Sequence, residues 1–355
     1  MKSVFSDLTV VEVASVLAGP AVGMFFAEKG AHVIKIENKR TFGDVTRSWK
    51  LPEEDAKSPV SAYFSAVNWH KEYHLLDFMK GAELEKLKSI VKQADILITN
   101  FKAGDAEKFG LDFASVVLLN DQVILAELSG FGSHDKRVAY DLVLQAETGY
   151  MSMNGEPNGN PVKMPVAFID LFAAHQMKEG ILEALLSQLK CRGAYHIEVS
   201  LYDAAIASLA NQASNYLMTG HIPQPLGSKH PNIAPYGEIF YTKDGFQITF
   251  AIGSDRQFQI LCEELDIPLE TEFNSNKDRV THRDQIAALL SNKVKERKAD
   301  ELIDALIAKK VPVAKIKDLK AVFEDPKAQS LILTEEIDHI PTKRVKTVIY
   351  TISKA

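Results

Sequence analysis

The sequence has 355 residues, of which 46% are hydrophobic and 25% are charged, and its formal net charge is −6. A chain of this length is expected to form about two domains, and its negative charge excludes the broad basic surface of a nucleic-acid-binding protein. No segment reaches the ~20 consecutive apolar residues of a membrane-spanning helix, and the N-terminus lacks the apolar core of a signal peptide. Cys191 and Cys262 are too few for a disulfide framework. We therefore expect a soluble protein of the cytoplasm.

The N-terminal half alternates short β-branched segments with segments of helical periodicity. Strands are expected at 8–14, 32–37, 95–100 and 195–201, and 122–132 is expected to form a strand followed by a glycine-broken loop. Helices are expected at 19–31, 83–94 and 202–220, and an extended run is expected to turn into a helix within 165–186. Such alternation predicts an α/β fold in which helices cover a Rossmann-like parallel sheet. Ligands of such sheets bind at the carboxyl ends of the strands.

The composition changes at 221–237, a segment with four prolines that we interpret as a linker. Beyond it, 237–253 is expected to form a hairpin that turns at Lys243-Asp244-Gly245, and helical patterns follow at 254–265, 281–296 and 298–310. The sequence therefore predicts a large α/β domain over 1–205, to which 320–355 returns, and a small α+β domain over 225–315. Residues 206–224 and 316–319 are the expected linkers, and the tail is expected to contain a strand at 345–353.

Asp170 is a single carboxylate inside the apolar segment 165–186. An aspartate that precedes an apolar helical run is a favoured N-cap, because it accepts hydrogen bonds from the N–H groups of the first turn. A carboxylate at a helix N-terminus is also expected to be held ionised by the helix dipole, as a carboxylate nucleophile requires. The pattern leaves both roles open.

Basic side chains follow several of the expected strands, namely Lys35, Lys39, Arg40, Arg47, Lys71, Lys102 and Lys108. On a chain of net negative charge this placement favours a bound polyanion such as a nucleotide phosphate. The turn at 16–23 (VLAGPAVG) either presents free N–H groups to a phosphate or an acyl oxygen, or is only a close strand–helix turn. It lacks the spacing of a dinucleotide site, and the histidines show no metal-ligand spacing. A G-x-S-x-G elbow of a serine hydrolase is also missing.

A series of motifs runs in fixed order along nearly the whole chain. They are VLAGP (16–20), GAHVIKIE…GDVTR (30–47), N-x-x-K…LDF (68–78), ADILITNFKAG (94–104), LSGFG (128–132), YDLVLQAETG (140–149), PVAFIDLFAA (165–174), VSLYDA (199–204), HPNIAPYG (230–237) and VPVAKIKDLKAVFEDP (311–326). Together they resemble the class III CoA-transferases, also called family III or the CaiB/BaiF type. The series is specific for the family but not for the substrate.

The resemblance implies a CoA-transferase, of the EC 2.8.3 type, that moves CoA from an acyl-CoA donor to a carboxylic acid without a tightly bound cofactor or metal. It implies Asp170 as the covalent nucleophile, which forms aspartyl anhydride and aspartyl-CoA intermediates. The implied CoA and substrate contacts are Val16, Leu17, Ala18, Lys39, Arg40, Lys71, Asn100, Phe101, Lys108 and Tyr140. The family forms interlocked homodimers, and neither a nucleic acid nor a membrane is implied as a partner.

Some positions depart from the family pattern. Asn38 stands where an arginine is common, so Lys39 or Arg40 is expected to contact phosphate. Leu17 replaces the glutamine of formyl-CoA:oxalate transferases, and AIGSDRQ (251–257) replaces their run of glycines, which argues against an oxalate or formyl substrate.

Two other functions remain as alternatives. An α-methylacyl-CoA racemase shares the fold, but Tyr140 occupies the position of its histidine base, and a phenol with an ordinary pKa of ~10 is a poor base at neutral pH. A non-catalytic acyl-CoA-binding paralogue is the third interpretation.

Overall fold

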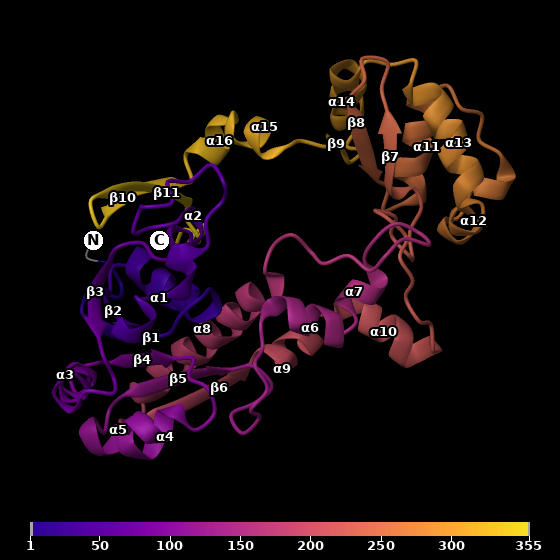
Figure 1. Cartoon of the computed structure of the whole chain (residues 1–355). Coiled ribbons are helices and arrows are strands. Elements are labelled where there is room, and N and C mark those ends of the chain that lie inside the picture. The colour runs from indigo at the N-terminus through magenta and orange to yellow at the C-terminus, as the bar shows by residue number, and fades with distance from the viewer. Residues whose placement is uncertain (1–2, 354–355) are drawn as a thin grey trace. The chain divides into compact units, whose positions relative to one another are not determined.

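The computed structural model describes residues 3–353, and within this range six parallel strands form the central sheet (Figure 1). The strands are β1 (Thr9–Val13), β2 (His32–Asn38), β3 (Lys71–Leu76), β4 (Ile96–Thr99), β5 (Ile124–Ser129) and β6 (Tyr195–Ser200). Their order in the sheet is β3-β2-β1-β4-β5-β6. β1 is central, because Val11 pairs with Ile34 of β2 on one side and with Leu97 of β4 on the other. The α/β fold with a parallel sheet that the sequence predicted is confirmed.

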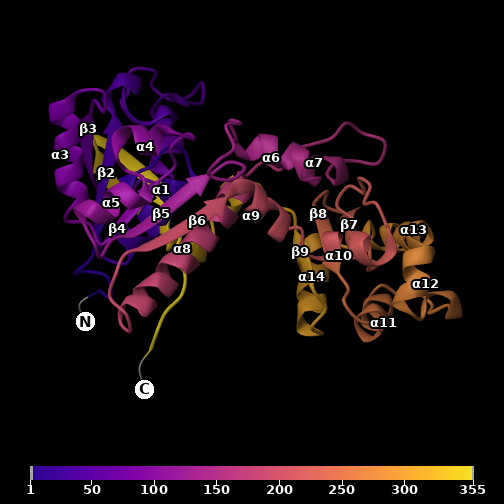
Figure 2. The same cartoon turned by 90° about the horizontal axis from the view of Figure 1, so that it is seen from below.

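Helices cover both faces of this sheet, so its central strand β1 is buried on both sides. The helices of this region are α1 (Ala18–Glu28), α2 (Ala62–Ser65), α3 (Gly81–Val91), α4 (Asp105–Phe109), α5 (Phe113–Leu119), α6 (Asp141–Glu147), α7 (Tyr150–Met153), α8 (Phe168–Gln188), α9 (Leu201–Ala207) and α10 (Ala210–Thr219). On one face α1 packs against α8, which crosses β5 and β6 (Figure 2). The contact with β6 is close, since a Cβ on Gly180 would lie 2.9 Å from the side chain of Ile197. On the other face Leu87 of α3 and Val116 of α5 join Val11 in one core cluster.

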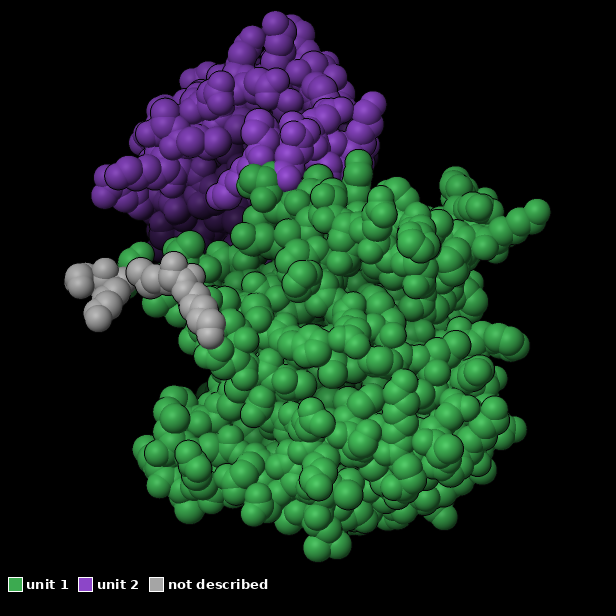
Figure 3. All heavy atoms as spheres, turned by 90° about the vertical axis from the view of Figure 1, so that its left-hand side faces the viewer, with its two compact units in different colours: residues 1–150, 163–221, 330–355 green, residues 151–162, 222–329 purple. Residues whose placement is uncertain are grey.

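The chain divides into two compact units, coloured separately in Figure 3. Unit 1 comprises 1–150, 163–221 and 330–355, and unit 2 comprises 151–162 and 222–329. The segment 151–162, which the sequence assigned to the large domain, therefore belongs to unit 2. Within unit 2 it is bound by the N–H of Gly227, which donates to the carbonyl of Gly155 at 2.8 Å.

Unit 2 contains a three-stranded antiparallel sheet in the order β7-β8-β9. Its elements are β7 (Tyr236–Tyr241), β8 (Gln247–Ala251), α11 (Asp255–Glu264), α12 (Asn276–Thr281), α13 (Arg283–Val294), α14 (Ala299–Ala308), β9 (Val313–Lys315), α15 (Leu319–Phe323) and α16 (Pro326–Gln329). The β7–β8 turn places Gly245 at φ +82°, a conformation that glycine adopts without strain. Phe240, Phe250 and Leu302 are among the residues of its own core.

The C-terminal segment returns to unit 1 as a hairpin of β10 (Ile332–Ile337) and β11 (Ile340–Val345), yellow in Figure 1. Ile337 packs with Val60 and Phe64 beside α2. The expectation of a strand at 345–353 is wrong, because β11 ends at Val345 and the residues after it form no ladder. This segment is bound instead by Glu28, whose carboxylate accepts the backbone N–H of Thr347 at 2.8 Å.

Other elements also differ from expectation, among them β3 and the helix expected at 202–220. β3 was not predicted as a strand, because this edge strand, KEYHLL, has no continuous apolar run and only its end residues Lys71 and Leu76 are buried. The helix expected at 202–220 is two helices, α9 and α10, which separate before Ala210, a residue at φ +49°. No helix in the range 3–353 is both long and apolar enough to cross a membrane.

Candidate active site

Two cavities lie at the carboxyl ends of the strands in unit 1. Cavity A has a volume of about 480 Å³ and lies among the loops after β1, β4 and β5, whereas cavity B has about 290 Å³ and lies among the loops after β1, β2 and β4. Asn100, Phe101 and Lys102 line both, so the two cavities are neighbours. β1 and β4 are adjacent strands at which the strand order reverses, and such a reversal is where open parallel sheets bind ligands.

The turn from β1 to α1 reaches cavity A through Val16, whose φ of +74° is rare for a β-branched residue. Asn100 fixes the preceding residue, since its amide accepts the Ser15 N–H at 3.1 Å and donates to the Ser15 carbonyl at 2.9 Å. Asp44 fixes Val16 itself by accepting its N–H at 3.2 Å. Side chains from two other loops thus hold this strained turn in place.

Asp44 belongs to a buried ionic quartet that also contains Glu12, Lys35 and Lys71. Glu12 bridges both ammonium groups, at 2.8 Å from Lys35 and 2.7 Å from Lys71, and Lys35 lies 3.1 Å from Asp44. Burial lowers the pKa of Lys35, but Glu12 and Asp44 more than offset this and raise the pKa above its ordinary value. Burial and the charge of Lys35 outweigh the carboxylates at Lys71 and lower its pKa to about 8.

The expected contact of Lys71 with CoA conflicts with this placement. Its ammonium is fully buried and donates to Glu12, to the Pro20 carbonyl at 2.9 Å and to Asn68 at 3.0 Å. These bonds use all three of its donors, so none is left for a phosphate. Lys71 has a structural role in the quartet.

Asp170 is the third residue of α8 and is not its N-cap, a position that Ala167 occupies without a side-chain hydrogen bond. The capping carboxylate comes from Asp141, at the start of α6, which accepts the N–H of Ile169 at 2.8 Å and that of Asp170 at 3.4 Å. The Asp170 side chain is buried and has no hydrogen-bond partner among residues 3–353. Burial, and secondly the charge of Asp141, raise the pKa of Asp170 to about 7, contrary to the expectation that the helix dipole holds it ionised.

Aromatic residues connect Asp170 to cavity A. Burial and the charges of Asp170, Asp141 and Asp44 raise the pKa of Tyr63 on α2, so this phenol lies within electrostatic reach of all three carboxylates. The ring of Trp49 lies 5.1 Å from that of Tyr63 and 6.3 Å from that of Tyr140, which lines cavity A. Sequence reasoning did not identify Tyr63 and Trp49, because neither belongs to a recognisable local motif.

The remaining predicted site residues fall into three groups. Val16, Asn100, Phe101 and Tyr140 line cavity A. Leu17 and Ala18 are buried at the start of α1. Lys39, Arg40 and Lys108 are exposed, the first two on the 3-10 helix Lys39–Thr41 and the third over the ring of Phe109 on α4.

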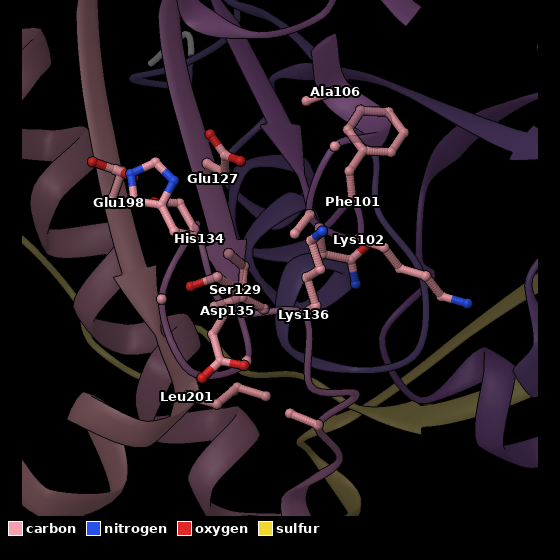
Figure 4. A pocket seen from close by; sticks show the side chains of 18 of the residues that line it. Phe101, Lys102, Ala106, Glu127, Ser129, His134, Asp135, Lys136, Glu198 and Leu201 are labelled. Atoms are coloured by element: carbon pink, nitrogen blue, oxygen red, sulfur yellow. The ribbon is translucent and has the colours of Figure 1, made fainter. Parts of the chain in front are cut away.

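Three basic residues outside the implied CoA contacts also line cavity A, namely Lys102, Lys136 and Arg137. Of these, only Lys102 was among the basic residues that the sequence suggested for a polyanion. Figure 4 shows Phe101 and Lys102, from the loop after β4, to one side of the cavity, and Glu127, Ser129 and His134 to the other. Arg137 is already paired with Asp135 at 2.9 Å and with Glu147 at 3.2 Å. Lys102 and Lys136 are therefore the better candidates for contact with phosphate.

One cluster of the described chain brings three metal-type ligands together, namely Glu127, His196 and Glu198, whose ligand atoms lie within 4.8 Å of one another. Sequence spacing did not suggest it, because Glu127 and Glu198 are paired residues of neighbouring strands. His196 lies 3.1 Å from Glu127 and stacks on Phe113 at 4.8 Å.

Residues 5–354 match the family described as CoA-transferase family III. A succinate–glutarate CoA-transferase of Agrobacterium fabrum is 35% identical over 346 residues, which span 95% of this chain and 86% of that relative. An acetyl-CoA:oxalate CoA-transferase of Acetobacter aceti is 30% identical over 90% of this chain and 82% of that relative. The crystal structure of a CaiB/BaiF family protein from Brucella suis, 35% identical, matches 99% of this chain and 93% of its own with a TM-score of 0.84. The chain therefore belongs to CoA-transferase family III, the enzymes that transfer CoA between acyl groups.

Proposed function

We propose that this CoA-transferase works through Asp170 as a covalent nucleophile. The observation that carries the proposal is the state of this carboxylate, which is buried, has no hydrogen-bond partner among residues 3–353 and has a pKa raised to about 7. A desolvated carboxylate is a stronger nucleophile than a hydrated one, because no solvation shell has to be removed before it attacks. A residue that only capped the helix would be hydrogen-bonded to the first turn.

The exchange then follows as four acyl transfers. A carboxylate oxygen of Asp170 attacks the thioester carbonyl of the donor, the C–S bond breaks, and an acyl–aspartyl anhydride forms as CoA leaves as its thiolate. The thiolate attacks the aspartyl carbonyl, which releases the donor carboxylate and leaves an aspartyl-CoA thioester. The acceptor carboxylate attacks this thioester, and the released thiolate then attacks the acceptor acyl carbonyl, which yields the new acyl-CoA and restores Asp170. No step consumes a proton or an electron.

Each of these attacks places negative charge on a carbonyl oxygen, which needs hydrogen-bond donors nearby. The N–H groups of Ala18 and Gly19, in the first turn of α1, have no carbonyl partner within the helix. They follow Val16, which lines cavity A. We assign the stabilisation of the oxyanion to these two groups.

CoA would occupy the two cavities, with its pantetheine chain passing Asn100 and Phe101, which line both. Lys102 also lines both cavities and Lys136 lines cavity A, so these ammonium groups are placed to contact the phosphates. As substrates we propose short dicarboxylic acids and their CoA thioesters, supported by the succinate–glutarate CoA-transferase at 35% identity.

The function is tested by incubating the enzyme with succinyl-CoA and a panel of carboxylates in deuterated water and identifying the products by mass spectrometry. Transfer of CoA to glutarate or another acceptor supports the proposal. Deuterium incorporation at the α-carbon without transfer would indicate a racemase, and neither reaction would indicate a non-catalytic acyl-CoA-binding protein. Trapping of the enzyme by hydroxylamine after addition of acyl-CoA should modify the peptide that contains Asp170.

We also propose that the chain is a homodimer. Several large apolar side chains of unit 1 are exposed in the single chain, among them Leu217 at 79% and Met218 at 84% on α10, and Ile352 at 84% near the C-terminus. Apolar surface of this kind is commonly covered by a partner. Sedimentation that gave a stable monomer at micromolar concentration would refute the dimer.

A further inference from the structure

The quartet of Glu12, Lys35, Asp44 and Lys71 touches the backbone of the β1–α1 turn at three points. Lys35 donates to the carbonyl of Ala14 at 2.8 Å, Asp44 accepts the N–H of Val16, and Lys71 donates to the carbonyl of Pro20. These three backbone groups lie before, within and after the turn. The turn is thus held along its whole length by buried charges that balance one another.

The local sequence is adapted to this arrangement. A Cβ on Gly23 would lie 1.9 Å from the Glu12 carboxylate, and a Cβ on Gly19 would lie 2.5 Å from the Cβ of Ala14. Both glycines of the first turns of α1 therefore leave the space that Glu12 and the turn occupy. A quartet that served only to stabilise the sheet would not need such close contact with α1.

The positive φ of Val16 is not favoured by its own side chain. At φ +74° its Cβ crowds its own backbone, and for a β-branched residue this region is strongly disfavoured. The N–H bond to Asp44 opposes relaxation to negative φ. Asp44 is itself oriented by Lys35 at 3.1 Å and by the Thr46 hydroxyl at 2.8 Å. Strain of this kind persists where the surroundings over-determine it, and it is concentrated at functional sites.

We propose that Asp44, oriented by Lys35 and Thr46, is a positioning residue that holds Val16 in the left-handed conformation and so aims the N–H groups at the start of α1 toward the reacting acyl group. This inference rests on the proposed function. Asp44 lines cavity B, but its carboxylate is engaged by Lys35, by the Thr46 hydroxyl and by the Val16 N–H, so the role inferred for it runs through the turn. If Val16 relaxes, α1 remains folded, but its first N–H groups no longer point at the oxyanion.

The test compares Asp44→Asn in three backgrounds: wild type, Val16→Gly and Val16→Ala. Asparagine keeps the shape of Asp44 but removes the charge that binds Lys35, so the side-chain oxygen that accepts the Val16 N–H is no longer held in place. Glycine adopts positive φ without strain, so it makes the clamp unnecessary, whereas alanine shortens the side chain but keeps the Cβ that causes the strain. We measure kcat for CoA transfer, the Kd for CoA and the melting temperature of each variant.

In the wild-type background Asp44→Asn should lower kcat by about tenfold, the size of the left-handed penalty of an L-residue, and leave the Kd for CoA nearly unchanged. In the Val16→Gly background the same change should cost only about twofold, while in the Val16→Ala background the loss should persist. An equal loss in all three backgrounds, or a loss confined to the Kd, would overturn the inference.

If Asp44→Asn does not fold, Thr46→Val provides a second test of the inference. Thr46→Val deletes only the hydroxyl that orients Asp44, at nearly constant volume, and should show a smaller loss of kcat that Val16→Gly again abolishes. No loss in Thr46→Val would count against the inference. If the wild-type enzyme transfers no CoA, both the proposed function and this inference are overturned. If the wild type is active but Val16→Gly does not rescue the Asp44 and Thr46 variants, only the inference is overturned.

Discussion

Replacement of Asp170 by asparagine tests two effects of its charge separately. One is how far the buried charge destabilises the fold, and the other is whether CoA transfer needs the carboxylate. The pKa of the carboxyl is raised from 3.8 to about 7, chiefly by burial, so the folded state binds the proton more tightly than the unfolded state does. Stability from this group is therefore fully present below the unfolded pKa and is lost as the pH rises through about 7. A tenfold change in proton affinity is worth about 1.4 kcal/mol, so the ionised carboxylate destabilises the folded enzyme by roughly 4 kcal/mol above neutral pH.

Asparagine does not ionise, and Asp170→Asn should therefore remove the contribution of this residue to the pH dependence of stability. Between pH 5 and pH 8 the free energy of unfolding of the wild type should fall relative to the variant by about 3 kcal/mol, measured by urea denaturation at each pH. The fixed cost of burying the amide cancels in this comparison. At pH 8 the variant should transfer CoA at least ~10³-fold more slowly than the wild type, because it lacks the nucleophile.

Asp203→Asn is the matched control, since Asp203 is also the third residue of its helix, α9, but is exposed. It should change neither the pH dependence of stability nor the transfer rate. If the free energy of unfolding depended on pH in the same way in Asp170→Asn and in the wild type, the reasoning about burial would be refuted. Transfer that survives in Asp170→Asn would refute the assignment of the nucleophile.

Three further outcomes are expected. Lys71→Met should reduce the free energy of unfolding by ~3–5 kcal/mol, because it leaves two buried carboxylates, Glu12 and Asp44, with the single ammonium of Lys35. Weaker CoA binding in a variant of unchanged stability would contradict this. Lys102→Ala combined with Lys136→Ala should raise the Kd for CoA in calorimetry, more at low salt than at high salt, while Lys86→Ala on exposed α3 surface should not. Asp141→Asn can still cap α8 but removes a like charge, so the pKa of Asp170 should fall and the pH–rate profile should move to lower pH; an unmoved profile would show that burial acts alone.

The sheet and most of its helices could be predicted because their signals are local. Apolar runs and helical periodicity identify β1, β2, β4 and α1 within a few residues of their observed bounds. The roles of charged side chains could not be read in this way. The interior position of Lys71 depends on Glu12, 59 residues away in the chain, and the cap of α8 comes from Asp141, 28 residues before Ile169.

Resemblance to the family suggested the proposed nucleophile and several residues of cavity A, but it could transfer only residue types and not their surroundings. Phosphate contact was expected of Lys71 because a lysine stands at the matching position, and the structure places its ammonium inside. Conversely, Lys136 lines cavity A, although it belongs to none of the recognised motifs. Which basic side chains reach a cavity depends on how the loops after β4 and β5 fold, and the sequence does not show this directly.

The return of the C-terminal hairpin to unit 1 has a consequence for how the protein is made. A ribosome releases the chain from its N-terminus, and domains generally begin to fold in that order. Unit 2 has all of its residues once Gln329 has emerged, whereas unit 1 still lacks Ile337, which completes the cluster around Phe64, and Asp338, which pairs with Arg47 at 2.8 Å. Unit 1, whose synthesis begins first, is therefore completed last, after unit 2, which is inserted within it. A nascent chain stalled at the point where Gln329 has just left the ribosome should contain a protease-resistant unit 2 and a unit 1 that is still open around α2.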